Sequence, residues 1–273
     1  GNIEVSSIGN LKELTYFNVT FNSLDSQIPQ ELMSLTKLQY LYLSRSDYGY
    51  PISEDPHEEA ATGGGDIHPG KHKGSENNIF RGAVPAPQNP SAMSLEWLVL
   101  SWTDSEETVV DGISAIPSEL FDITTFVGIQ IAANNNIADL PFPSGITNMA
   151  NLDHLNLGGT TDARNDPYDW LTGSLPTGFG QLSNLRFLRI SGHQNLTIDF
   201  DDIDFSGMTS LKQILAKGCN IQGNLPPELF DGTIPDMYSI IISWPSNNIG
   251  AEGSHPAVAD GLGGGPGYKI FQY

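Results

Sequence analysis

One apolar spacing recurs along most of the chain. It is clearest between Leu182 and Ile190, where the sequence LSNLRFLRI follows the pattern L-x-x-L-x-x-L-x-L. Copies in the same phase begin at Leu11, Leu35, Ala92, Ile123, Met149, Leu182, Met208 and Ile234. Each copy ends with apolar and polar residues in alternation, which predicts a short strand with one buried face. Repeated units of this kind predict a stack of similar coils rather than one closed core.

A proline step follows many of the copies. Examples are Ile28-Pro29, Ile116-Pro117, Leu140-Pro141 and Leu175-Pro176. Because proline interrupts regular structure, we expect each step to return the chain along the opposite side of the coil. The sixth copy lacks the step and carries an acidic run from Asp199 to Asp204 instead.

The spacing of the copies defines the domain organisation. The first two copies begin 24 residues apart, but the third begins 57 residues after the second, which leaves an insertion at 47–79. Loops of this length are usually functional or mobile. We expect residues 1–10 to be a truncated repeat or N-terminal cap, 11–244 to be a solenoid of about eight repeats, and 245–273 to be a C-terminal cap or tail.

Charge and cysteine content exclude several classes of function. The net charge is −20, from 32 acidic and 12 basic residues, so binding to nucleic acids or anionic membranes is not expected. A single cysteine, Cys219, rules out a disulfide framework within the chain, and we expect it to be buried and inert. No apolar run is long enough to cross a membrane. Since the chain starts at Gly1 rather than Met, we expect an export signal to have been removed.

The combined motif, L-x-x-L-x-x-L-x-L-x-x-N followed by L-x-G-x-[IL]-P-x-x-L, resembles the leucine-rich repeat family. The best matches are 11–35, 171–182 and 211–229. The resemblance implies an α/β fold, a right-handed horseshoe-shaped solenoid with one parallel β-sheet on the concave face and few or short helices on the convex side. The proline-containing variant is called plant-type and also occurs in bacterial surface proteins. Irregular spacing and the lack of paired-cysteine caps favour a bacterial protein that is secreted or displayed at the cell surface.

Candidate binding residues are those that point outward from the predicted strands. We single out Tyr16, Tyr40, Tyr42, Arg45, Trp97, Trp102, His154, Phe187 and Arg189. Because neighbouring parallel strands lie ~4.8 Å apart, the aromatic residues of the first three strands are expected to form one patch. Two interpretations are open: the patch contacts a ligand or partner, or the 47–79 insertion folds over it. His154 is expected to stand alone on this face, without an acid partner.

No arrangement of residues predicts catalysis or a cofactor. The histidines of the insertion, His57, His68 and His72, match no metal-ligand spacing, and a solvated loop is the favoured interpretation. The acidic run lacks the order of a calcium-binding loop, which leaves calcium binding there untested. We therefore predict a monomeric, non-enzymatic module without metal or cofactor, which recognises a protein or peptide. The alternatives are a glycan-binding surface protein and a structural spacer within a longer surface protein.

Overall fold

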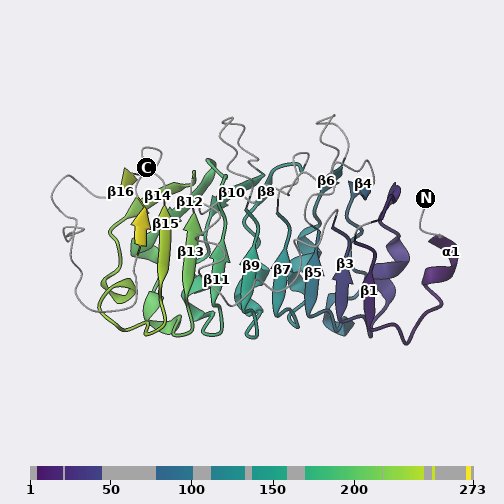
Figure 1. Ribbon diagram of the computed structural model, residues 1–273, viewed down its shortest axis with the longest axis horizontal. Coiled ribbons are helices and arrows are strands. Elements are labelled where there is room, and N and C mark those ends of the chain that lie inside the picture. Colours follow the sequence, from purple (N-terminus) through teal and green to yellow (C-terminus); the bar gives the residue numbers. More distant parts are fainter. Residues whose placement is uncertain are drawn as a thin grey trace.

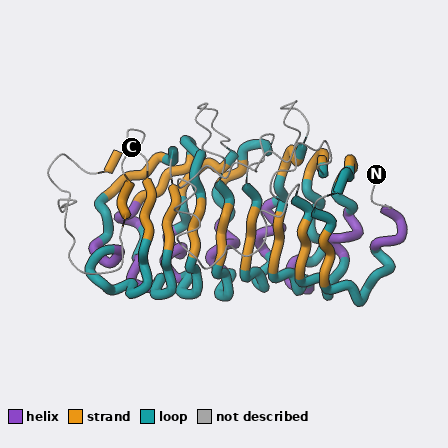
Figure 2. Tube along the Cα trace, viewed as in Figure 1, coloured by secondary structure: helices purple, strands orange, loops and turns teal. Residues whose placement is uncertain are grey.

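The protein is an elongated stack of coils, with α1 (Val5–Ile8) at one end and β17 (Lys269–Phe271) at the other (Figure 1). The computed structural model describes residues 5–20, 22–44, 78–100, 112–132, 137–158, 170–216, 218–242, 248–249 and 269–271. Within these ranges each coil contributes one strand to a long parallel sheet, and most coils place a short helix on the opposite side (Figure 2). None of the helices in these ranges is long and apolar enough to cross a membrane.

The long sheet has nine parallel strands, which follow one another in chain order. They are β1 (Tyr16–Asn18), β3 (Tyr40–Tyr42), β5 (Trp97–Val99), β7 (Gly128–Gln130), β9 (His154–Asn156), β11 (Phe187–Arg189), β13 (Gln213–Ala216), β15 (Ser239–Ile242) and β17. All eight strands predicted by the repeat are present. The ninth, β17, pairs with β15 and places Ile270 opposite Ile240, so the sheet continues into the segment for which the sequence predicted a cap or tail.

Short helices line the opposite side of the stack. They are η1 (Gln30–Ser34), η2 (Pro90–Ala92), η3 (Ser118–Asp122), η4 (Ser144–Asn148), η5 (Thr177–Gln181), η6 (Phe200–Asp202), η7 (Phe205–Gly207) and η8 (Pro227–Leu229). Pro29, Pro117, Pro143, Pro176 and Pro226 directly precede five of these helices. The helices are single 3₁₀ turns, as expected where the chain must reverse within a few residues.

The predicted position of the proline step in the fourth copy is wrong. The chain turns at Phe142-Pro143, not at Leu140-Pro141, because Phe142 supplies the buried side chain of the step and is 7% exposed. Leu140 is half-buried and belongs with Pro141 to the short strand β8.

Two smaller parallel sheets connect the strands to the helices and were not predicted. One contains β2 (Asp25–Gln27), β4 (Ile79–Ala83) and β6 (Ile113–Ala115). The other contains β8 (Leu140–Pro141), β10 (Leu171–Ser174), β12 (Leu196–Asp199), β14 (Asn220–Gly223) and β16 (Asn248–Ile249). These strands pair the backbone N–H and C=O groups of neighbouring coils with one another.

The sixth copy, which has no proline step, uses aspartates to begin its turns. Asp199 Oδ1 accepts a hydrogen bond from the backbone N–H of Asp201, and Asp204 Oδ1 accepts one from the N–H of Ser206. Hydrogen bonds from the hydroxyl and the N–H of Ser206 lower the pKa of the Asp204 carboxyl. The acidic run therefore replaces proline by side-chain capping.

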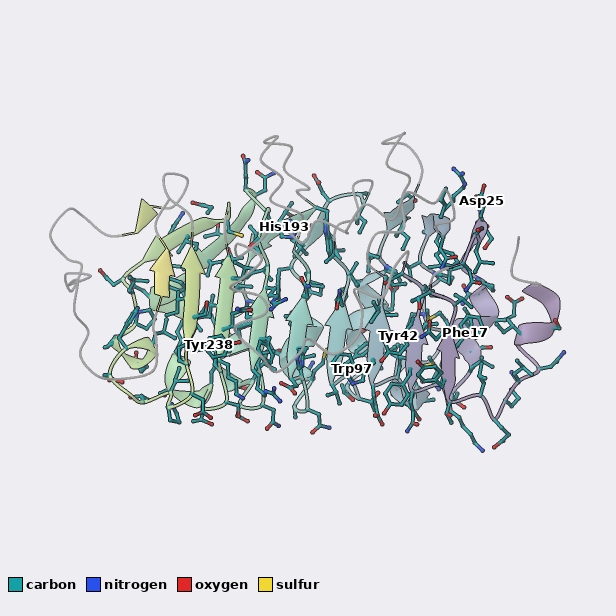
Figure 3. The ribbon with its side chains drawn as sticks, in the orientation of Figure 1. Phe17, Asp25, Tyr42, Trp97, His193 and Tyr238 are labelled. Atoms are coloured by element: carbon teal, nitrogen blue, oxygen red, sulfur yellow. The ribbon has the colours of Figure 1, made fainter. Side chains whose placement is uncertain are left out.

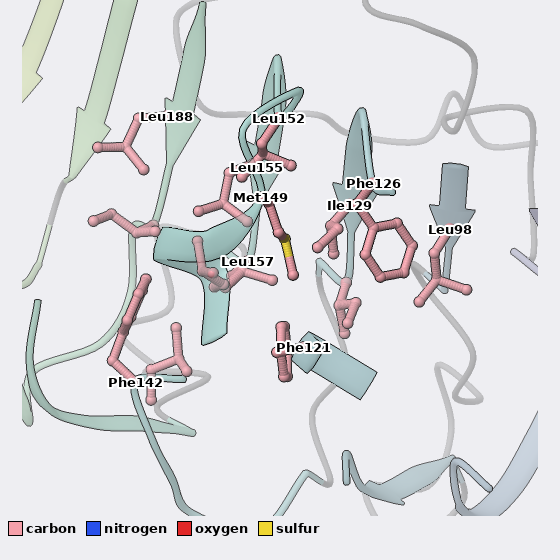
Figure 4. Close-up of a cluster of buried hydrophobic side chains, with 14 of the residues drawn as sticks. Leu98, Phe121, Phe126, Ile129, Phe142, Met149, Leu152, Leu155, Leu157 and Leu188 are labelled. Carbon is pink, nitrogen blue, oxygen red and sulfur yellow. The ribbon is translucent and has the colours of Figure 1, made fainter. Parts of the chain in front are cut away.

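The core runs along the whole stack between the sheet and the helices. Leu98, Ile129 and Leu155 come from neighbouring strands, and Phe121 reaches them from η3 (Figure 4). The exposed fraction of these four side chains is 0–1%. Each buried aliphatic side chain of this size contributes about 1.5–3 kcal/mol by leaving water. The stack is less covered at its first coil, where Leu11 and Tyr16 are 51% and 49% exposed.

One position in the core is underpacked. Ala216 occupies the place held by Leu157 and Ile190 in earlier coils, and it borders a small apolar cavity. We expect Ala216→Val to raise the free energy of unfolding by up to about 1 kcal/mol, because the added methyl groups fill existing space. Leu157→Val at the equivalent position should lower it by about 1 kcal/mol. Urea unfolding of both variants measures this, and destabilisation by Ala216→Val would show that the cavity cannot take a larger side chain.

Candidate functional site

The outward side chains of the long sheet form rows that cross its strands. Paired residues place Tyr16, Tyr40, Trp97, Gly128, His154, Phe187, Gln213 and Ser239 in register, and we call this set the outer row. A second row, two residues further along each strand, contains Asn18, Tyr42, Val99, Gln130, Asn156 and Arg189. Seven of the nine predicted site residues lie in these two rows.

Three tyrosines form a cluster at the start of the sheet. The Tyr16 ring lies 5.9 Å from the Tyr40 ring and 5.7 Å from the Tyr42 ring, measured between centroids, with tilts of 42° and 40°. The side chain of Asn18 donates a hydrogen bond to the Tyr16 hydroxyl over 3.1 Å, which fixes the outermost ring. We call these three residues the tyrosine cluster.

The Tyr40 hydroxyl is held by an acidic residue that the sequence did not single out. It donates to Glu96 Oε2 over 3.2 Å, and Gln39 Nε2 donates to the other carboxylate oxygen over 3.2 Å. The negative charge of Glu96 raises the pKa of Tyr40 above its usual value of 10.0, so this hydroxyl stays protonated. Glu96 and Gln39 directly precede strands, at positions outside the alternating pattern that identified the other candidates.

Trp97 reaches across the neighbouring strand. A side chain at Gly128 would place its Cβ 2.3 Å from the indole ring, so the ring lies directly against the glycine backbone. The indole thereby reaches His154, with ring centroids 5.3 Å apart, and His154 stacks on Phe187 at 4.6 Å and 30°. Gly128 is not a gap in the outer row, because it provides the space that Trp97 fills.

His154 is not alone on this face, in contrast to the sequence-based expectation. Its Nδ1 lies 3.5 Å from Asp153 Oδ1, and Arg186 Nε lies 3.5 Å from the same oxygen. The Arg186 guanidinium also lies 5.2 Å from the centre of the Phe187 ring. The partner was missed because Asp153 is the residue just before strand β9.

Burial divides the predicted site into two parts. Phe187 is 2% exposed, and both His154 and Arg189 are 7% exposed, so these side chains are largely inaccessible. Arg189 also donates from Nε to Gln213 Oε1 over 2.9 Å. Tyr16 is 49% exposed, whereas Tyr40 and Trp97 are half-buried. The accessible aromatic side chains therefore lie on β1, β3 and β5, in the part of the sheet where Figure 3 labels Tyr42 and Trp97.

Two predicted site residues, Arg45 and Trp102, lie outside the described residues. The same holds for the insertion except its last two positions, Asn78 and Ile79. The interpretation that the insertion folds over the aromatic patch therefore stays a prediction.

Several buried side chains form hydrogen bonds with the backbone of neighbouring coils, and only one of them, Cys219, was identified from the sequence. Asn78 is fully buried, and its amide donates to the backbone oxygens of Val19 and Ser44 over 2.6 and 3.1 Å. His193 Nε2 lies 2.7 Å from the oxygen of Leu157. Cys219, which is buried as expected, donates from Sγ to the oxygen of Ile190 over 2.9 Å.

The described residues contain no group of three or more His, Cys, Asp or Glu side chains placed to hold a metal ion. In the acidic run, Asp201 accepts hydrogen bonds from the N–H and the amide of Asn224 in the next coil. These carboxylates therefore have partners within the protein. Calcium binding by them was left open by the sequence and is not tested by these contacts.

The repeat, the parallel sheet and the row of short helices define a leucine-rich repeat solenoid. Its fold is similar to the ectodomain of the plant membrane receptor kinase GASSHO1/SCHENGEN3 from Arabidopsis thaliana, with a TM-score of 0.62 and 21% identity over 91% of this chain. It is also similar to internalin C2 from Listeria monocytogenes, with a TM-score of 0.50 and 11% identity over 95% of this chain. The chain spans 23% of the receptor ectodomain and 80% of the internalin. No family model and no curated protein matches the sequence.

Proposed function

We propose that this solenoid is a non-enzymatic binding module that recognises a protein or peptide through the outer row. One observation supports this above the others: Tyr16, Tyr40 and Trp97 lie in register on three consecutive strands of the sheet and keep accessible surface. Aromatic side chains on a rigid surface give large contact area at little cost in conformational entropy, which is why they are typical of interface hot spots.

Within this proposal the two parts of the site have different roles. The accessible rings of Tyr16, Tyr40 and Trp97 contact the partner. The buried His154 and Phe187 hold the Trp97 indole in place from the other side. Arg45 and Trp102 stay predicted contacts at the edge of the same surface.

The proposal also covers the cellular location of the protein, its class of partner and its oligomeric state. A receptor ectodomain solved in complex with CASPARIAN STRIP INTEGRITY FACTOR 2 and an internalin share the fold, which supports an extracellular or cell-surface location. The net charge of −20 argues against nucleic-acid partners. We further propose that the module acts as a monomer and needs no cofactor.

A glycan is the second candidate ligand. Tyrosine and tryptophan rings with accessible faces also stack on sugars, and Tyr16, Tyr40 and Trp97 keep accessible surface on the outer row. Binding of glycans from an array, lost in the same variants that lose peptides, would favour this alternative. A structural spacer would bind neither class of ligand.

The test is selection from a random peptide library displayed on phage. We expect enriched peptides to bind the wild-type protein and to lose at least about tenfold in affinity when Tyr16→Ala and Trp97→Ala are combined, since each hot-spot truncation typically costs about 2 kcal/mol or more. The control is Leu11→Ala, which removes an equally exposed apolar side chain away from the outer row. Equal binding by the double variant and the control would contradict the proposal.

A further inference from the structure

The tyrosine cluster and Glu96 combine two features that together favour a cation. Tyr16 lies within 6 Å of both Tyr40 and Tyr42, and the rings are tilted rather than stacked flat, so their faces are not fully used on each other. Aromatic faces attract ammonium and guanidinium groups within about 6 Å of the ring centre. Tyr42 is only 8% exposed and supports the cluster from below, so the accessible π-faces are those of Tyr16 and Tyr40, beside the carboxylate that holds the Tyr40 hydroxyl.

The Glu96 carboxylate has hydrogen bonds but no counter-ion in the described part of the chain. Its partners there are the neutral Gln39 amide and the Tyr40 hydroxyl. Two described basic residues of the nearest coils pair with other carboxylates, Lys37 with Glu13 and Arg81 with Asp25. A half-buried carboxylate in this position, on a protein with a net charge of −20, favours a positively charged group in its vicinity.

Both components are held in place before any ligand arrives. Asn18 fixes the Tyr16 hydroxyl, while Glu96 and Gln39 fix the Tyr40 side of the cluster. Hydrogen bonds from protein groups thus orient the rings and the carboxylate, which reduces the entropy lost when a ligand is bound.

We propose that the tyrosine cluster and Glu96 form a subsite for a lysine or arginine side chain of the bound protein or peptide. This inference rests on the proposed function, because it names the chemistry of a partner that the outer row binds. The aliphatic part of the basic side chain packs on Tyr16, and its charged end lies between the tyrosine faces and the Glu96 carboxylate. The recognised partner is therefore basic at this position, in accord with the acidity of the whole chain.

The test uses the same random peptide library, with the whole 273-residue chain. We expect the enriched peptides to carry lysine or arginine at a common position and to lose affinity when that residue is replaced by alanine. Glu96→Gln should weaken binding by about three- to tenfold, and Tyr16→Leu by a similar factor because it keeps apolar area but removes the π-face. Glu119→Gln on the exposed surface of η3 is the matched control and should leave the affinity unchanged.

The outcomes separate this inference from the proposed function. Peptides that bind through Tyr16 and Trp97 but show no preference for basic residues, with Glu96→Gln equal to wild type, would overturn the cation subsite and leave the binding face intact. Peptides insensitive to the Tyr16 and Trp97 changes would overturn both. A loss of affinity with rising salt in the wild type, absent in Glu96→Gln, would support the subsite because screening weakens charge attraction. Thermal unfolding of each variant shows whether the fold is retained.

Discussion

Acidification is expected to destabilise this protein through the buried ring of His193. His193 is fully buried, and the loss of water around its ring lowers its pKa from 6.5 to about 4, although the hydrogen bond with Leu157 opposes the shift. Its Nδ1 faces the backbone N–H groups of Trp170 and Leu171 at 3.4 Å, so it acts as an acceptor and Nε2 carries the proton. The folded state thus requires the neutral ring.

The direction of the effect follows from the two pKa values. Because the unfolded chain takes up a proton near pH 6.5 and the folded chain only near pH 4, the stabilisation is complete above about pH 6.5 and is lost as the pH falls toward about 4. The whole contribution is about 3 kcal/mol. Urea unfolding at about pH 7 and about pH 4.5 should show this loss in the wild type.

His193→Asn provides the control for this prediction. An asparagine oxygen can still accept from the N–H groups of Trp170 and Leu171 but does not titrate, so the variant should lose about 2 kcal/mol less than the wild type between these two pH values. Other titrating groups affect both proteins equally. An identical pH dependence in the two proteins would show that His193 does not carry the effect.

Asn78→Ala is expected to cause the largest loss of stability among single substitutions that remove a hydrogen-bonding side chain. The Asn78 amide donates to the oxygens of Val19 and Ser44, and its oxygen accepts from the N–H of Leu24 over 3.1 Å. Removing it leaves three backbone groups, one buried and two partly buried, without this partner, at a cost of about 2–4 kcal/mol. Hydrogen exchange should show the loss first in β1, since Asn78 connects the first coil to the second.

Asn22→Ala is the matched control. Asn22 also donates to the Val19 oxygen, over 2.9 Å, but its side chain is exposed and water can replace it. We expect it to cost less than about 1 kcal/mol. Equal effects of the two substitutions would show that burial of Asn78 does not determine its contribution.

Most of the fold follows from the sequence because the strands repeat in phase. The pair Leu98 and Leu100 and the pair Leu155 and Leu157 are buried as their alternation predicts. The smaller sheets were missed because strands such as Leu140–Pro141 are too short to show alternation. The fourth proline step was misplaced because two prolines stand two residues apart and spacing alone does not tell which follows the buried side chain.

The buried side chains that hydrogen-bond to the backbone of neighbouring coils could be recognised only in part from the sequence. Cys219 and His193 lie 26 residues apart, which equals the spacing between their repeats, so the phase that identified Cys219 also points to His193. Asn78 lies at the end of the long insertion, where the phase is interrupted, and no spacing signals its role.

The candidate site shows a similar limit. Sequence placed Tyr16, Tyr40 and Trp97 in one row correctly, because the row depends on strand register. It did not reveal that Trp97 extends over Gly128 or that Glu96 holds Tyr40, since both depend on side-chain conformation across strands. Nor did spacing indicate that Phe187 and Arg189 are buried.

The central claim is that the outer row is the binding surface, and a complete binding scan tests it most directly. Each outward position of β1, β3, β5, β7, β9 and β11 would be replaced by alanine or, at Gly128, by serine, alongside an equal number of exposed positions on the η helices. Affinity for the library-selected peptides would be measured for each folded variant. We expect the losses to concentrate at Tyr16, Tyr40 and Trp97, and at Gly128 through displacement of the indole. Losses concentrated on the helical side, or spread evenly over both sides, would contradict the claim.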